Sequence, residues 1–184
     1  MPRDPTNTER SDAELVAALN RGDASAFDAL YYRHRDFVAR TARRFAGNDE
    51  DALDALQETF AYLFGKFPGF VLTAKLTTFL YPVVKHLSLA AKQKRMRIGS
   101  GAAVPERATI DPPPGDARDE LSSVLGRLPE PQREVLLLRF VDDFSLAEIA
   151  AALAVPLGTV KSRLHTAVAS LQADPALRKY FEID

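Results

Sequence analysis

Cysteine and tryptophan are both absent from this sequence of 184 residues, and the formal net charge is only −1. Without cysteine, neither disulfides nor thiolate metal sites can hold the fold, which fits a reducing compartment. The three histidines are scattered along the chain, so we expect no metal site and no cofactor. No apolar run reaches the length of a membrane span, and the N-terminal segment lacks the apolar core of a signal peptide. These absences predict a cytoplasmic protein without membrane insertion.

The small net charge conceals two strongly charged segments. Residues 49–58 contain five acids and no cation, whereas residues 85–97 contain five cations and no acid. We therefore expect an acidic and a basic surface on the same chain. Hydrophobic residues make up 46% of the sequence and charged residues 27%, which is typical of a globular protein.

In the first half of the chain, apolar residues recur at helical spacing. Ser11 and Glu14 form a capping box before a short helix that stops at Gly22, and Asp23 is placed to cap a longer helix that ends at Gly47. His34 lies on the apolar stripe of the longer helix, which indicates a histidine at the edge of the core and not a ligand. A third helix is expected over residues 51–64, with these side chains inward: Leu53, Leu56, Phe60, Leu63 and Phe64.

The helical pattern is interrupted after residue 65. Pro68 and Gly69 predict a loop over residues 66–75 that exposes apolar groups. Helical spacing returns over residues 79–87 and leads into the basic run. Pro82 falls inside this pattern, where it should start or kink the helix because it lacks a backbone donor.

A segment rich in proline and glycine separates the two halves of the chain, and we interpret it as a flexible linker. The predicted fold is all-α, with two small helical domains joined by this linker. The expected boundaries are a tail over 1–10, a first domain over 11–97, the linker over 98–119, a second domain over 120–172 and a tail over 173–184.

The second domain contains the spacing of a helix-turn-helix. A capping box at Ser145 opens a short helix, the turn passes through Ala154, and Val160 anchors the following helix inward. If Ala154 is left-handed, this costs about 1 kcal/mol relative to glycine. The outer face of the last helix has cations and hydroxyls but no acid, and suits a DNA groove: Thr159, Lys161, Ser162, Arg163, His165 and Thr166. The alternative is an ordinary solvated face of a helical bundle.

Three pieces of the second domain, LPEPQREVLLLRF, SLAEIA and GTVKSRLHTA, resemble the promoter-binding C-terminal domain of bacterial sigma factors of the extracytoplasmic-function (ECF) group. The first domain resembles the same family independently. Its segment DALDALQETFAYLF is similar to the helix that docks on RNA polymerase, and TTFLYPVVKHLSLAAKQKR is similar to the helix that faces the upstream promoter element.

The resemblance implies a sigma factor that binds core RNA polymerase and directs promoter recognition. It implies docking on the coiled coil of the largest subunit through Asp54, Gln57 and Glu58, and a second contact with the polymerase flap. The residues alone leave another interpretation for these acids, because an acidic first turn also favours the helix dipole. The resemblance further implies capture of an unpaired promoter strand, near the −10 position, by the loop over 67–77 and the next helix, with these candidate residues: Phe70, Lys85, His86, Lys92, Lys94 and Arg95. The residues alone leave core packing as the alternative for Phe70. The distal element, near −35, would be read by the six residues of the last helix given above.

Three departures from the family pattern weaken the expectation of strand opening. Phe79 stands where a tryptophan is common, His86 replaces an asparagine, and Pro82 interrupts a usually continuous helix. A sigma-like decoy or regulator that binds polymerase or a control protein without opening DNA is therefore an alternative, and a stand-alone helix-turn-helix regulator is another. No nucleophile, phosphate loop or metal constellation points to an enzyme or a small-molecule substrate. The family also implies an anti-sigma factor as partner.

Overall fold

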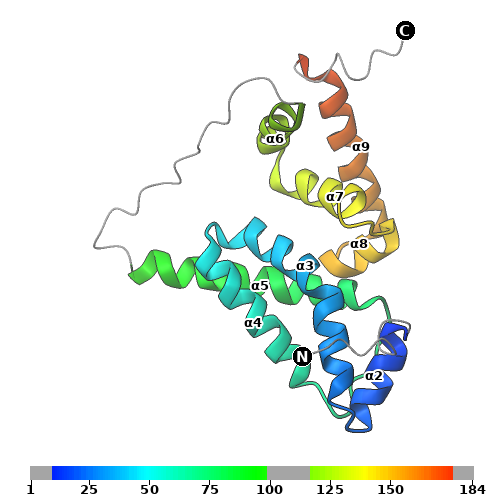
Figure 1. Ribbon diagram of the computed structural model, residues 1–184. Helices are drawn as coiled ribbons and strands as arrows, with labels where there is room; N and C mark the ends of the chain where they lie inside the picture. Colours follow the sequence, from blue (N-terminus) through cyan, green and yellow to red (C-terminus); the bar gives the residue numbers. More distant parts are fainter. Residues whose placement is uncertain (1–9, 99–116, 176–184) are drawn as a thin grey trace. The chain divides into compact units, whose positions relative to one another are not determined.

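The computed structural model describes residues 10–98 and 117–175, which form eight helices and no strand (Figure 1). The chain divides into two compact units, Met1–Ala103 and Val104–Asp184. The predicted all-α fold is confirmed. Most of the predicted linker and of both predicted tails lies outside the described residues. The first helix described in the second unit starts at Ala117.

The first unit opens with α2 (Asp12–Asn20) and α3 (Ser25–Ala46). The predicted capping box is present, since the Ser11 hydroxyl accepts the backbone N–H of Glu14 and the Glu14 carboxylate accepts that of Ser11. Asp23 lies one residue before the N-cap of α3, and its carboxylate accepts the backbone N–H of Ser25 at 3.2 Å. Gly47 ends α3 in the left-handed region, as its spacing predicts.

His34 on α3 is buried, with 7% of its surface exposed, as predicted for a histidine at the edge of the core. Its Nε2 lies 2.9 Å from Oδ2 of Asp12, and Oδ1 of Asp12 accepts a hydrogen bond from Arg33 at 2.7 Å. This polar cluster ties the first turn of α2 to α3.

The helix α4 (Asp49–Phe64) packs against both α3 and α5 (Leu76–Ile98). The prediction of its inward face was wrong at both ends, because Leu53 is 55% exposed and Phe64 is 52% exposed. Small residues take the inward positions beside the larger apolar ones, so that the buried set is Ala52, Ala55, Leu56, Thr59, Phe60 and Leu63. Alanine on a helix face allows a neighbouring helix to approach closely, whereas the sequence pattern had favoured the larger side chains.

Pro82 lies inside α5, which continues for 23 residues and begins at Leu76. The expectation that Pro82 would start the helix was therefore wrong. The proline removes the donor that would bond the carbonyl of Thr78, at a typical cost of about 3 kcal/mol. Its ring faces solvent, and its neighbours Leu80, Tyr81 and Val84 are fully buried. Tertiary burial on both sides of the proline thus keeps the segment helical.

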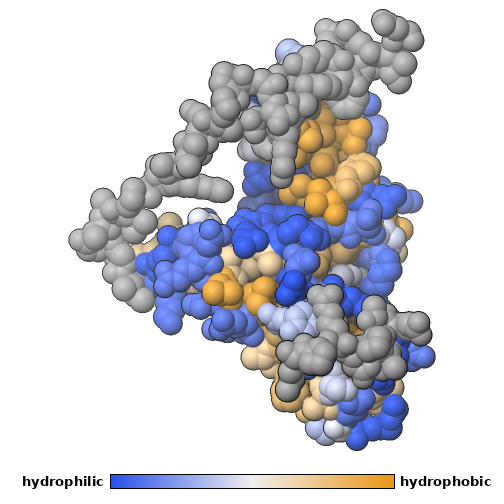
Figure 2. All heavy atoms as spheres, in the orientation of Figure 1, coloured by the Kyte–Doolittle hydropathy of each residue, from blue (hydrophilic) through white to orange (hydrophobic). Residues whose placement is uncertain are grey.

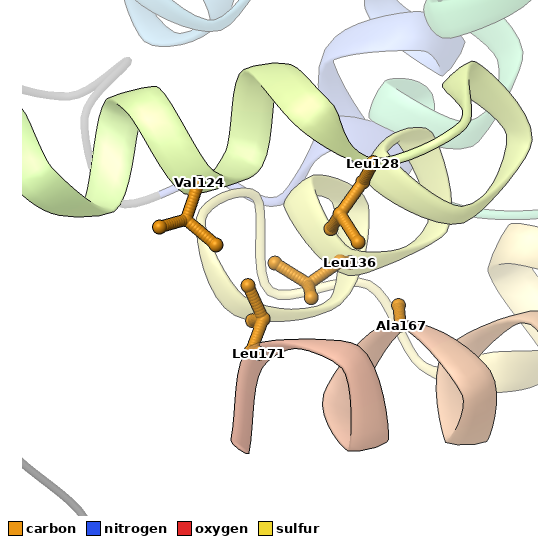
Figure 3. Packing of buried hydrophobic residues seen from close by; sticks show 5 residues of the cluster. All are labelled: Val124, Leu128, Leu136, Ala167 and Leu171. Carbon is orange, nitrogen blue, oxygen red and sulfur yellow. The ribbon is translucent and has the colours of Figure 1, made fainter. Parts of the chain in front are cut away.

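The second unit contains α6 (Ala117–Arg127), α7 (Glu130–Phe140), α8 (Leu146–Leu153) and α9 (Leu157–Ala173). Figure 3 shows the side chains that meet in its core, from α6, the turn that follows it, α7 and α9: Val124, Leu128, Leu136, Ala167 and Leu171. This core fixes α9 against α6 and α7, and it leaves the opposite face of α9 toward solvent.

The surface of the described residues mixes hydrophilic and hydrophobic groups (Figure 2). The large hydrophobic side chains that remain exposed include Val71, Phe140 and Val141. Within residues 10–98 and 117–175, no helix is both long enough and apolar enough to cross a bilayer.

Candidate nucleic-acid and protein interfaces

The helices α8 and α9 form the predicted helix-turn-helix. The capping box at Ser145 is present, with Glu148 accepting the backbone N–H of Ser145 at 2.7 Å and donating its own N–H to the Ser145 hydroxyl. Ala154 ends α8 with φ 53° and ψ 43°, which is the left-handed conformation that the motif requires. The N–H of Val155 then bonds the carbonyl of Ala150, which closes the turn.

One side of α9 is buried and the other carries the predicted DNA-facing residues. Val160 and Ala167 are fully buried, while the predicted inward residues Leu164 and Val168 are only half-buried. Of the predicted readers, Thr159 and Arg163 are half-buried and the rest are exposed: Lys161, Ser162, His165 and Thr166. The structure therefore places these six side chains off the buried stripe of one helix that contains no acidic residue.

Two of these residues already use one hydrogen-bond donor within the helix. The Thr166 hydroxyl donates to the carbonyl of Ser162 at 3.0 Å, so its oxygen can accept from DNA but its hydrogen is already used. The backbone N–H of Thr159 donates to the carbonyl of Pro156 at 2.9 Å and is not available to a phosphate.

On the first unit, α4 presents a separate acidic surface. Asp54, Gln57 and Glu58 are all exposed, and their spacing places them one helical turn apart. Within residues 10–98, Asp54 and Glu58 make no ion pair, whereas two of the three acids of the first turn do. Asp49 pairs with Arg43, and Asp51 pairs with Arg95. The exposed Leu53 adds an apolar group beside this acceptor surface.

The loop between α4 and α5 holds Phe70 in a fixed setting. Its half-buried ring contacts the ring of Phe79, with centroids 4.8 Å apart, and that of Phe67 at 5.6 Å. Its backbone is bonded by the side chain of Asn20, the last residue of α2. Asn20 escaped the sequence analysis, because no local pattern signals a contact between residues 50 positions apart.

The five predicted DNA-binding residues of α5 do not share one face. Residues 85, 92 and 95 recur near helical repeats, whereas 86 and 94 project elsewhere. Lys85 lies with Nζ 5.2 Å from the ring centroid of Phe45, and Arg95 donates to Asp51 at 2.8 Å. His86 and Lys94 are exposed. Lys85, Lys92 and Arg95 thus lie along one side of α5, and His86 and Lys94 lie off that side.

The two helical units, one of which presents a helix-turn-helix with an acid-free outer face, define a helical protein of the DNA-binding class. A family model described as sigma-70 region 2 matches residues 30–98, and one described as sigma-70, region 4 matches residues 118–171. An ECF RNA polymerase sigma factor, SigM of Mycobacterium tuberculosis, is 34% identical over 170 residues, which cover 89% of this chain and 84% of the relative. The chain belongs to the ECF group of the sigma-70 family of RNA polymerase sigma factors.

Further similar proteins agree with this assignment. The ECF RNA polymerase sigma factor SigW of Bacillus subtilis is 25% identical over 169 residues, covering 82% of this chain and 89% of the relative. Among solved structures, CnrH in complex with the cytosolic domain of CnrY gives a TM-score of 0.65 at 25% identity, covering 88% of this chain and 95% of that one. The sigma factor RpoE in complex with the anti-sigma factor NepR from Bartonella quintana has a similar fold, with a TM-score of 0.64 at 22% identity, covering 85% and 98% of the two chains.

Proposed function

We propose that this sigma factor binds core RNA polymerase through the outer face of α4 and reads two promoter elements, the proximal one with the first unit and the distal one with the second. It acts by binding and not by catalysis, and it works in the cytoplasm. The observation that carries the proposal is the match of both units to sigma-70 regions, together with candidate binding residues on each unit that are exposed or half-buried.

For polymerase docking, the support is the unpaired acceptor surface on α4. The carboxylates of Asp54 and Glu58 and the amide of Gln57 can accept hydrogen bonds from arginines on the largest-subunit coiled coil. The neighbouring acids Asp49 and Asp51 are already paired within the unit. The specificity of polymerase binding therefore depends on the three exposed acceptors. The second unit contacts the polymerase flap in this proposal.

For the proximal element, the support is an aromatic side chain in the loop before α5 together with the cations on one side of that helix. Phe70 provides a stacking partner for an unpaired base, and such stacking contributes about 1 to 3 kcal/mol per base. Lys85 and Lys92 lie on one side of α5, where they can neutralise the backbone of the captured strand. Arg95 shares that side but contributes less to DNA, because Asp51 partly neutralises its charge. His86 and Lys94 are exposed elsewhere on α5, and their contacts are with backbone phosphates.

For the distal element, α9 enters the major groove. Lys161 and Arg163 contact guanine edges or phosphates, and Ser162 and His165 contact bases or backbone. Thr166 acts as an acceptor only, since its hydroxyl hydrogen bonds Ser162. Thr159 lies at the start of the helix, where its hydroxyl can reach a phosphate.

An anti-sigma factor completes the set of partners. The solved structure of RpoE from Bartonella quintana contains the anti-sigma factor NepR, and that of CnrH contains the cytosolic domain of CnrY. We propose that this chain is held inactive by a protein that covers its binding surfaces.

The test is to form the complex of the full chain with bacterial core polymerase and to map its footprint on a promoter recovered from genomic fragments. We expect two separate protected segments, with permanganate-reactive thymines only in the proximal one. Protection of the distal segment alone, without reactive thymines, would contradict the role given to the first unit.

A further inference from the structure

The side chain of Asn20 makes three hydrogen bonds to the backbone of the loop that carries Phe70. Its Nδ2 donates to the carbonyl of Phe70 at 2.8 Å, and its Oδ1 accepts the N–H groups of Gly69 at 2.7 Å and of Phe70 at 3.1 Å. Asparagine can do this because its amide has both donors and an acceptor with two lone pairs. The amide thus supplies hydrogen bonds to the loop backbone that a neighbouring strand or helix turn would supply in regular secondary structure.

The loop has few other means of holding its backbone. Residues 68–75 belong to no helix, so their polar groups need partners outside regular structure. Gly69 has φ +104°, a conformation that the side chain of another residue would strain. With Asn20 bonding the peptide groups and Phe79 supporting the ring at 4.8 Å, Phe70 is restrained at both its backbone and its side chain.

Asn20 is itself part of a firmly held element. Four side chains of α2 are buried, Leu15, Val16, Ala18 and Leu19. At the opposite end of α2, Asp12 is bonded to His34 and to Arg33. A side chain on an element anchored in this way can transmit a fixed position to the loop.

We propose that Asn20 is a positioning residue for promoter opening, which holds the loop so that Phe70 is already placed to stack on the unpaired base. The inference rests on the proposed role of Phe70 in strand capture. A loop ordered in advance does not lose conformational freedom when the base arrives, and that loss would otherwise weaken capture. Asn20 touches the loop backbone and not the base, so it affects how tightly a strand is captured and leaves base preference unchanged.

The test compares Asn20→Ala with Asn48→Ala in the complex of the full chain with core polymerase. Asn48 is a matched control, since its side chain accepts the N–H of Asp51 at 2.7 Å as the N-cap of α4 and it does not touch the loop. The probe is the single non-template strand of a promoter mapped by transcription of genomic fragments, with 2-aminopurine replacing one base at a time. Core binding and thermal unfolding are measured on the same samples.

We expect Asn20→Ala to weaken capture of the strand roughly tenfold, the equivalent of one lost hydrogen bond at the upper end of the usual range. Core binding should be unchanged, and Asn48→Ala should lower the unfolding temperature without weakening capture. Asn20→Asp keeps the acceptor for both N–H groups and should retain more of the capture than Asn20→Ala.

Two failures are distinguishable in this design. If Phe70→Ala captures the strand as well as the unchanged protein does, the proposed role of the loop is wrong. If Phe70→Ala loses capture but Asn20→Ala is no weaker than Asn48→Ala, the loop captures the strand and the positioning role of Asn20 is overturned.

Discussion

Nε of Arg95 lies 2.8 Å from Oδ2 of Asp51, an ion pair between the basic end of α5 and the acidic first turn of α4. The Asp51 side chain is only 15% exposed, and it also accepts from Asn48. The two oppositely charged segments of the sequence are therefore partly joined to each other. Part of the charge that we had expected to contact RNA polymerase and DNA therefore stabilises the first unit itself.

This pair predicts different defects for two neighbouring cations. Arg95→Ala should lower the stability of the first unit by about 1 kcal/mol, because it leaves a half-buried carboxylate without its partner. Lys94→Ala should leave stability unchanged and weaken binding to promoter DNA, because Lys94 is exposed. Thermal unfolding and DNA titration of both variants check this. Equal stability of the two variants would contradict the structural role of Arg95.

The left-handed residue of the helix-turn-helix predicts a stabilising substitution. Ala154→Gly should raise the stability of the second unit by about 1 kcal/mol, because φ of 53° strains a residue with a Cβ. Ala151→Gly, at an exposed position inside α8, should lower it by a similar amount. Denaturant unfolding of the two variants should move in opposite directions. A loss of stability in both would show that Ala154 is not strained.

The outer face of α9 predicts a DNA-binding defect separable from folding. Arg163→Ala should weaken distal-element binding by about 1 to 3 kcal/mol and relax base preference at one position. Gln172→Ala, on the exposed end of the same helix, serves as the control and should bind normally. Fluorescence anisotropy with substituted distal elements measures both effects. Unchanged affinity and preference in Arg163→Ala would remove this residue from the interface.

The acceptor surface of α4 predicts a polymerase-binding defect. Glu58→Ala should weaken the complex with core polymerase by about 1.5 to 3 kcal/mol, the usual contribution of a hydrogen bond to a charged group. Glu50→Ala removes another exposed acid, from the first turn of α4, and should have a much smaller effect. Competition for core polymerase distinguishes the two, and equal weakening would indicate a general charge effect without a specific site.

The anchor of α2 predicts a dependence of stability on pH. Burial raises the pKa of Asp12, but the hydrogen bonds and charges of His34 and Arg33 outweigh it and leave the pKa below its ordinary value of 3.8. A lowered folded-state pKa means that the ionised carboxylate stabilises the fold above pH 3.8 and that this contribution is lost as the pH falls through the folded-state pKa. Asp12→Asn should therefore be less stable than the unchanged protein at pH 7, and the difference should shrink below pH 3.8. A constant difference in acid unfolding curves would contradict this account.

The helices were predictable where the signals are local. The capping boxes at Ser11 and Ser145 and the left-handed ends at Gly47 and Ala154 all lie within a few residues of the helix ends that they define. The inward face of α4 was less predictable, because Ala52 and Ala55 are buried where Leu53 is exposed. Large apolar side chains dominate a periodicity pattern, but close helix packing favours the small ones.

The contacts that hold the candidate site residues in place could not be predicted from the sequence. The contacts of Asn20 with Phe70 and of Arg95 with Asp51 join residues 50 and 44 positions apart, and no spacing in the sequence signals them. Pro82 shows that a local signal can also mislead, because tertiary packing overrides it. Its local effect is to break a helix, and only the burial of Leu80, Tyr81 and Val84 explains why α5 continues.

The central claim, that this chain gives polymerase promoter specificity, is tested most directly by transcription from genomic DNA fragments with core RNA polymerase in the presence and absence of the purified chain. We predict transcripts that start at discrete sites only when the chain is present. A stable complex with core polymerase that starts no transcript on any fragment would contradict the claim and would indicate a regulator that binds polymerase without opening DNA.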